Sequence, residues 1–191
     1  DKAEDLSLNQ ARFKAVAENL PSMLLAWVVN VLAISFVFVP LAPAWLWAPP
    51  VVLSIFYGST RGWYWIRASK RLLSDKDAAI ALQRCRISLV GLSIGATFWY
   101  AGLACYSNDL AIGMLMISSG GLMVVGLFGV IHVRWGAYAL AGMSFVVLTS
   151  ITLTLGLTGV GVALLIGFGM MCLVNIARGH ARSFDNLVLS R

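Results

Sequence analysis

The chain has 191 residues, of which 60% are hydrophobic and only 12% are charged, and its formal net charge is +6. Because a soluble domain carries about 25% charged residues, this composition excludes an ordinary soluble domain and indicates a membrane protein. The positive charge lies in loops and at helix ends, where contact with anionic lipid explains it, so we expect a lipid bilayer and no nucleic acid as partner. The three cysteines are scattered and predict no disulfide framework and no metal site.

The first predicted element is a short amphipathic helix within residues 1–21. Phe13, Val16, Ala17 and Leu20 recur at helical spacing, so they share one face of this helix. We expect the helix to lie in the cytoplasmic membrane interface. Packing against a partner subunit fits the same pattern.

Six apolar stretches follow, each near the roughly 20 residues that a helix needs to cross a bilayer. They are residues 22–39, 46–66, 87–106, 110–131, 135–155 and 160–177. The stretches lack the alternation of a lipid-facing strand, so they are predicted to be helices. Pro21 is expected to open the first span. Ser74 followed by Asp77 resembles a capping box and predicts a helix that begins near Asp75 and continues into the third span.

All fourteen Lys and Arg residues fall on one side of this threading. They occupy the first tail, the second and fourth connections with the adjoining helix ends, and the last tail: Lys2, Arg12, Lys14, Arg61, Arg67, Lys70, Arg71, Lys76, Arg84, Arg86, Arg134, Arg178, Arg182 and Arg191. Basic loops stay in the cytoplasm. The sequence therefore predicts an all-α membrane protein, a six-helix transmembrane bundle with both termini cytoplasmic.

No span carries Asp or Glu in its central part, and neither histidine lies mid-membrane, so we predict no catalytic residue and no metal site. The candidate ligand or signalling residues are Arg61, Trp99, Tyr100, Ser118, Ser119, Gly120, His132 and Arg134.

Each candidate has two interpretations. Arg61 either extends its side chain to the inner headgroups or binds an anionic lipid. Trp99 and Tyr100 serve as interfacial anchors or contact a ligand. Residues 118–121 of the fourth span, Ser-Ser-Gly-Gly, pack closely against other helices or open a cavity. His132 and Arg134 form a tight inner turn or belong to a site.

The last segment, residues 178–191, continues the sixth span without a proline and is predicted to begin a cytoplasmic signalling helix. The chain starts at Asp1 without an initiator Met and ends within this helix. We therefore expect it to be an excised piece of a longer protein in which a membrane input region precedes an output domain.

Several short motifs resemble one family. They are the segment Arg61-Gly62-Trp63-Tyr64-Trp65 with the basic residues after it, the linker Asp77-Ala78-Ala79 leading to Arg84-Cys85-Arg86, the aromatic outer turn 98–109, and His132-Val133-Arg134. From about Arg12 to Arg191 the chain resembles the N-terminal six-span region of bacterial diguanylate cyclases and phosphodiesterases with GGDEF and often EAL output domains. The resemblance implies a homodimer in the bacterial inner membrane and an attached output that makes or degrades cyclic di-GMP.

The favoured function is thus a membrane sensory input domain that signals through its last helix, and the chain itself is not expected to be an enzyme. A small transporter or channel is the alternative, although no charged or discontinuous-helix site marks the midplane. An intramembrane enzyme fits least, because no acid–base groups converge. The sequence indicates no cofactor and no particular stimulus.

Overall fold

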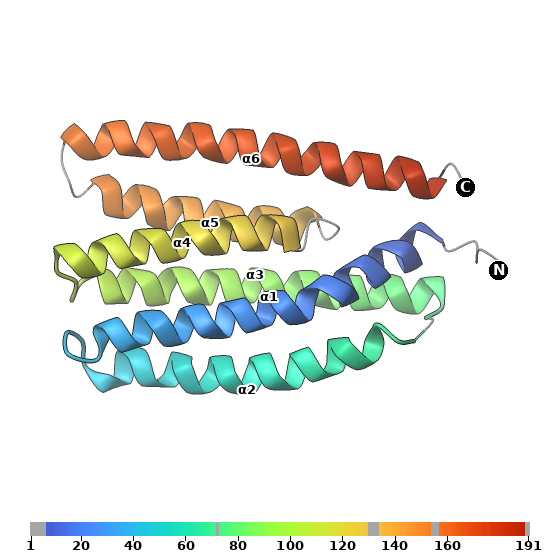
Figure 1. Cartoon of the computed structure of the whole chain (residues 1–191), viewed down its shortest axis with the longest axis horizontal. Helices are drawn as coiled ribbons and strands as arrows, with labels where there is room; N and C mark the ends of the chain where they lie inside the picture. The colour runs from blue at the N-terminus through green and yellow to red at the C-terminus, as the bar shows by residue number, and fades with distance from the viewer. Residues whose placement is uncertain (1–6, 72, 130–133, 154–156, 190–191) are drawn as a thin grey trace.

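The computed structural model describes residues 7–71, 73–129, 134–153 and 157–189 (Figure 1). The order of the helices is α1 (Leu8–Phe38), α2 (Ala44–Ala68), α3 (Asp75–Ala104), α4 (Asp109–Gly129), α5 (Arg134–Leu153) and α6 (Leu157–Leu189). No strand occurs within these ranges. The prediction of an all-α chain is therefore confirmed.

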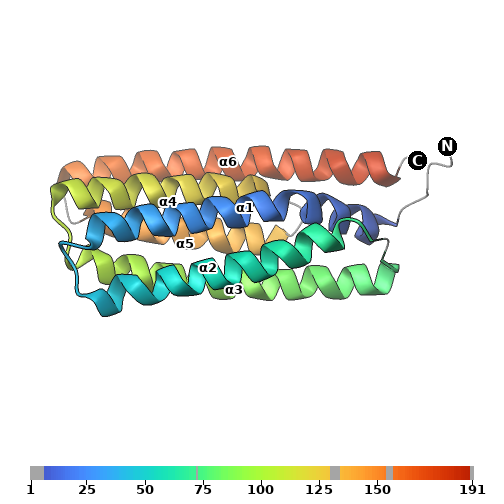
Figure 2. The same ribbon diagram turned by 60° about the horizontal axis from the view of Figure 1, so that its bottom comes forward.

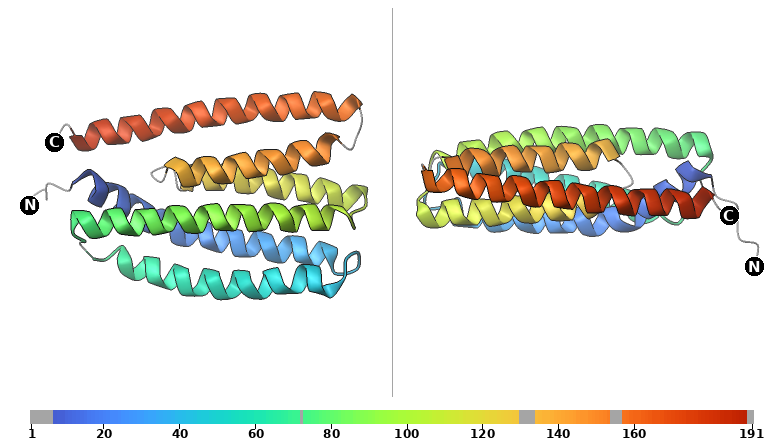
Figure 3. Two further views of the ribbon diagram at one scale, coloured as in Figure 1. Left: turned by 180° about the vertical axis from the view of Figure 1, so that it is seen from behind. Right: turned by 90° about the horizontal axis from the view of Figure 1, so that it is seen from above.

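The helices form an elongated bundle in which successive helices run antiparallel (Figures 1 and 2). α1 packs mainly on α2 and also touches α3 and α4, whereas α5 packs on α3, α4 and α6. α2 and α6 lie at opposite edges of the bundle, as the view from behind shows (Figure 3). α2 and α3 touch each other little, although they are consecutive.

The start of α1, the α2–α3 connection and the end of α6 lie at the same end of the bundle (Figure 1). We call it the basic end, because the segments there carry Arg12, Lys14, Arg67, Lys70, Arg71, Lys76, Arg84, Arg86, Arg178 and Arg182. At the opposite end, the connections 39–43 and 105–108 contain no Lys or Arg. The fold thus gathers the described basic residues as the threading predicts, while the side of a membrane that this end faces stays a prediction.

Four helical segments of the described chain are long and apolar enough to cross a membrane: Leu8–Phe38, Asp75–Ala104, Asp109–Gly126 and Ala163–Val188. Ala141–Thr152 of α5 is a shorter apolar helix. The bundle also turns large apolar side chains outward on several helices, including Phe36, Phe98, Ile117 and Leu164, which are 83%, 75%, 73% and 71% exposed. An apolar surface of this extent indicates a lipid environment rather than water.

The first helix differs from the predicted arrangement. α1 continues through Pro21 as one helix, whereas the sequence predicts an interfacial helix that ends before a span at residues 22–39. The face that carries Phe13, Val16 and Leu20 is at most 3% exposed, since it packs on α2 and α3 within the chain. Burial of this face outweighs the single backbone hydrogen bond that Pro21 cannot donate.

Capping interactions fix the start of α1 against the α2–α3 connection. Ser7 and Gln10 form a capping box, in which the Gln10 backbone N–H donates to Ser7 Oγ over 3.3 Å and the Ser7 N–H donates to Gln10 Oε1 over 2.9 Å. Gln10 Nε2 also donates to the Leu73 carbonyl over 2.7 Å, and Ser7 and Asn9 both donate to the Asp75 carboxylate. These bonds join α1 to the residues that precede and begin α3.

The predicted start of α3 is confirmed. Ser74 is its N-cap, and Ser74 Oγ accepts from the Asp77 backbone N–H over 3.2 Å. From there α3 runs unbroken to Ala104. Asp75 and Asp77 stand in its first turn, where the helix dipole favours negative charge.

The described residues form two large apolar clusters and a small third one, in which Ala141 of α5 and Ala177 of α6 are buried. The cluster near the basic end is built from α1, α2 and α3 and includes Phe13 and Trp65, whose ring centroids are 5.5 Å apart. The cluster toward the opposite end contains the fully buried Phe38, Leu103 and Leu115. The second cluster includes Tyr100, which takes part in a polar contact between helices. A cavity lies beside the first cluster and shares Trp65 and Leu89 with it.

Candidate functional site

The polar contact joins three helices by Asn30 of α1, Tyr100 of α3 and Ser118 of α4, which we call the polar triad. Asn30 Nδ2 donates to Tyr100 Oη over 3.0 Å, and Ser118 Oγ donates to Asn30 Oδ1 over 2.8 Å. The Tyr100 and Ser118 hydroxyls are also hydrogen-bonded to each other. Tyr100 is 3% exposed and Ser118 is 9% exposed. The ring of bonds is closed, so each hydroxyl can donate once and accept once within the triad.

The triad is neutral, and nothing in it can act as a strong general base or as an ion-pair partner. In a membrane, the triad would stabilise the packing of the three helices, because it pairs polar groups that hydrocarbon cannot hydrogen-bond. Two predicted candidates, Tyr100 and Ser118, thus meet, and they meet as a contact between helices. This geometry supports the packing interpretation of Ser118. Tyr100 was expected to be an interfacial anchor or a ligand contact, and here it is instead a buried contact between helices.

Three further candidates surround the triad. Trp99 is half-buried, and its indole N–H donates to the Leu46 carbonyl of α2 over 3.1 Å. Ser119 is 3% exposed and donates over 3.4 Å to the Ser144 carbonyl of α5. Gly120 is half-buried with open space where a Cβ would stand. The bonds of Trp99 and Ser119 join α3 to α2 and α4 to α5, respectively.

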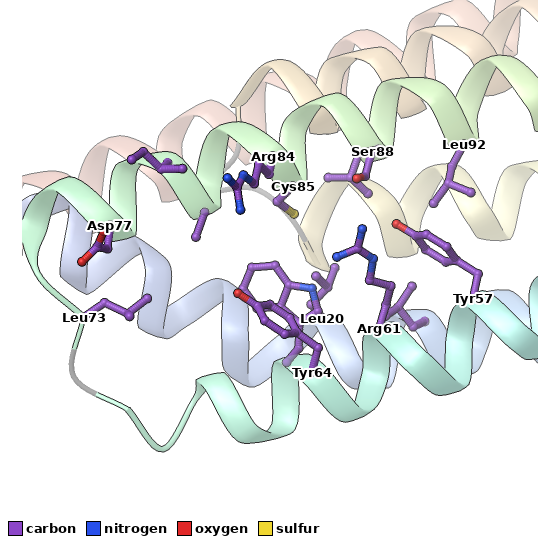
Figure 4. A pocket seen from close by; sticks show the side chains of 15 residues that line it. Leu20, Tyr57, Arg61, Tyr64, Leu73, Asp77, Arg84, Cys85, Ser88 and Leu92 are labelled. Carbon is purple, nitrogen blue, oxygen red and sulfur yellow. The ribbon is translucent and has the colours of Figure 1, made fainter.

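A cavity of about 430 Å³ lies at the basic end, between α2 and α3 and against α1 (Figure 4). Its volume is within the ~300–1,000 Å³ of small-molecule sites. It is lined by Leu20, Leu24, Tyr57, Arg61, Tyr64, Trp65, Leu73, Asp77, Ile80, Ala81, Arg84, Cys85, Ser88, Leu89 and Leu92. We call it the basic-end cavity.

Two guanidinium groups reach the basic-end cavity from opposite walls, Arg61 from α2 and Arg84 from α3 (Figure 4). Arg61 Cζ stands 5.7 Å from the centroid of the Tyr57 ring. Within the described residues, neither guanidinium forms an ion pair with a carboxylate. The acidic lining residue is Asp77, whose Oδ2 accepts from Ser74 Oγ over 2.7 Å.

An ion pair joins the two ends of the chain. Arg12 of α1 donates to both carboxylate oxygens of Asp185 in α6. The Nε–Oδ1 distance is 3.1 Å and the Nη2–Oδ2 distance is 2.8 Å. The side chains are 24% and 14% exposed. Two parallel bonds fix the orientation of the partners as well as their distance. The end of α6 is thereby held against the start of α1.

The structure does not describe the side chains of two candidates, His132 and Arg134. His132 lies outside the described residues. Arg134 begins α5, and its side chain is likewise outside them. The basic inner turn that both were expected to form therefore stays a prediction.

In the part of the chain that the structure describes, no three His, Cys, Asp or Glu side chains group closely enough to hold a metal ion. Cys85, Cys105 and Cys172 are free thiols.

The sequence alone selected Arg61 but missed Arg84, Tyr57 and Ser88 as its neighbours. A usable signal existed, because Arg61 and Arg84 stand about two turns from the α2–α3 connection on antiparallel helices. This spacing places the two side chains at one level. The ion pair of Arg12 with Asp185 has no such signal, since it depends on how α6 packs.

Comparison of the chain with protein-family models, with curated proteins and with solved structures finds no match. The resemblance to the input regions of cyclic di-GMP enzymes therefore stays a prediction from the sequence.

Proposed function

We propose that the chain is a six-span membrane input domain that passes a change in helix packing through α6 to an output domain in the cytoplasm. The four membrane-length segments, with α2 and α5, supply the six spans. The basic end would face the cytoplasm, because Lys and Arg are disfavoured in translocated loops. In this arrangement α6 ends beside the start of α1, where an attached domain would follow.

The observation that carries the proposal is the ion pair of Arg12 with Asp185. α6 extends beyond the described part of α5 toward the basic end (Figure 1). There its contact with the rest of the bundle includes this pair to α1. A shift of α1 against its neighbours would therefore move the end of α6. Such a device needs two packings of similar energy, which a stimulus stabilises unequally.

The resemblance supports the identity of the output as a synthase or phosphodiesterase of cyclic di-GMP, and the bacterial inner membrane as the location. A homodimer is the expected assembly. α6 supports it with an outward apolar face on which Leu164, Leu165 and Phe168 are 71%, 71% and 63% exposed. Lipid or a second α6 would cover that face.

The parent reading frame gives the first test, since a GGDEF or EAL motif should follow residue 191. In the parent protein, cellular cyclic di-GMP is then measured for Arg12→Ala, for Asp185→Ala, and for the exchange Arg12→Asp with Asp185→Arg. Each single change should shift the level in the same direction, because both break one ion pair. The exchange should restore it, because the opposite charges are again adjacent.

Arg182→Ala is the matched control, since it removes an exposed cation from the same helix. It should leave cyclic di-GMP unchanged. Equal levels in all variants would contradict the coupling. Solute flux in liposomes that contain the purified chain would favour the transporter or channel instead.

A further inference from the structure

We propose that the basic-end cavity binds the phosphate group of an anionic phospholipid from the leaflet at the basic end. The proposal requires that the chain lies in a membrane, and it does not depend on any output domain. In this proposal, Arg61 and Arg84 are the two cations that bind the phosphate. Three helices supply most of the cavity lining, and Leu73 of the α2–α3 connection completes it.

The cavity offers hydrogen-bond donors for which the described residues supply no acceptor. Within the described residues, no hydrogen bond is formed by the hydroxyls of Tyr57, Tyr64 and Ser88, which line the cavity together with the two guanidinium groups. Figure 4 shows Arg61 and Arg84 directed toward the space between α2 and α3. A phosphate carries several acceptor oxygens, and guanidinium groups bind it by paired hydrogen bonds.

The charge of the cavity also calls for an anion. Arg61 and Arg84 bring two positive charges to the same cavity, so each charge disfavours the other. Asp77 offsets one of these charges, but its carboxylate already accepts from Ser74. A bound phosphate would lie between the two cations and remove their repulsion. Basic pockets between membrane helices bind anionic headgroups in this way.

The apolar part of the lining identifies a lipid as the source of the phosphate. Leu24 and Leu89 in this lining are already buried in the core. Tyr57 of α2 and Leu92 of α3 are only half-buried, and they stand farther from the α2–α3 connection than Arg61 and Arg84. Acyl chains that enter between α2 and α3, which touch each other little, would cover these side chains. A soluble phosphate would leave them uncovered. The arginines stand where the apolar stretch of α3 begins, at the level expected for headgroups.

The test measures lipid retained by the complete chain. The protein is purified in a neutral detergent, incubated with phosphatidylglycerol or with phosphatidylcholine, and examined by native mass spectrometry. In a second arm, inorganic phosphate replaces the lipid. We expect retention of phosphatidylglycerol over phosphatidylcholine, and an occupancy about tenfold lower for Arg61→Gln with Arg84→Gln. Inorganic phosphate should not bind detectably.

The matched control is Arg67→Gln with Arg86→Gln, which removes the same charge from the same helices. Arg67 instead lies over the Trp63 ring, 4.4 Å from its centroid, and Arg86 lines a different groove with Tyr138. This control should retain phosphatidylglycerol. Ser88→Phe, which fills the cavity and keeps both arginines, should lose it. Circular dichroism shows whether each variant keeps its helix content.

Three results would overturn the proposal. Equal loss in both arginine pairs would mean that diffuse positive charge attracts the lipid. Full retention by a folded Ser88→Phe variant would place the lipid elsewhere. Binding of inorganic phosphate without phosphatidylglycerol would make the ligand a soluble anion.

Discussion

Tyr100 connects α1, α3 and α4 through one hydroxyl group, since that oxygen accepts from Asn30 and is bonded to Ser118. Its ring also meets Trp99 edge-on, with centroids 5.4 Å apart. Polar contacts of this kind between membrane helices contribute about 0.6 kcal/mol on average and up to ~1.7 kcal/mol. Because the bonds of the triad close a ring, we expect its contribution to exceed the average.

Tyr100→Phe should therefore lower the free energy of unfolding by about 1 kcal/mol. The change keeps the ring and removes the hydroxyl, so Asn30 and Ser118 lose one partner each. Thermal unfolding in detergent measures the effect. Tyr106→Phe is the control, because Tyr106 is an exposed residue just beyond α3. Equal melting temperatures for the two variants would show that the triad adds no stability.

The sequence predicted some of the residues at these sites and none of their contacts. Ser118 and Arg61 stood out because polar residues are rare in the spans, and Tyr100 stood out as an aromatic residue near the outer end of the third span. Tyr100 and Asn30 are 70 positions apart in the sequence, so their contact depends on the relative heights and rotations of α1 and α3. Packing sets these values, and neither periodicity nor hydropathy encodes them.

At the scale of the elements, α1 and α2 make the closest approach that the structure records at a glycine. A Cβ added at Gly58 of α2 would stand 2.5 Å from Val28 Cγ2 of α1. Valine has a stiff χ1 angle in a helix, so this methyl group cannot easily turn aside. Gly58 therefore allows the two helices to pack, whereas Gly91 and Gly95 of α3 stand in open space.

Gly58→Ala should destabilise the bundle by about 1–3 kcal/mol, the range for overpacking. Adding Val28→Ala should recover part of the loss, because it removes the colliding methyl group. Gly62→Ala on the same helix meets nothing within 4 Å and should not destabilise. Thermal unfolding of the unchanged protein and of these three variants measures the differences in stability. A Gly58→Ala protein as stable as the Gly62→Ala protein would contradict the close approach.

The helix boundaries show which signals the sequence carries. Ser74 predicted the start of α3 correctly, because capping is a local interaction within one turn. Pro21 suggested a boundary that α1 does not have, because burial of the face with Phe13, Val16 and Leu20 outweighs the one hydrogen bond that proline cannot donate. Local chemistry thus predicted where helices can begin, and tertiary burial decided where α1 does begin.

On the scale of the whole molecule, the arrangement of charge gives a direction to the bundle. The described Lys and Arg residues lie toward the basic end, and the opposite connections have none. The sequence predicted this separation because it follows from chain order and helix length alone. It did not predict the cavity between α2 and α3, which depends on how far those helices diverge.

The sidedness of the bundle can be tested with its own thiols. Cys105 is exposed at the end opposite the basic end, and Ala79 is exposed near the start of α3. One variant keeps Cys105 and replaces Cys85 and Cys172 by Ala. A second replaces all three by Ala and adds Ala79→Cys. Neither variant alters a charge, so the positive-inside bias is preserved.

A membrane-impermeant maleimide applied to intact spheroplasts should label Cys105 and should label Ala79→Cys only after permeabilisation. The reason is energetic: moving the basic end across the membrane would translocate the many cations gathered there, whereas the opposite connections carry none. The reverse pattern would invert the bundle and place the proposed lipid site in the outer leaflet. Labelling of both positions from the same side would contradict α3 as a span, and with it the six-span threading.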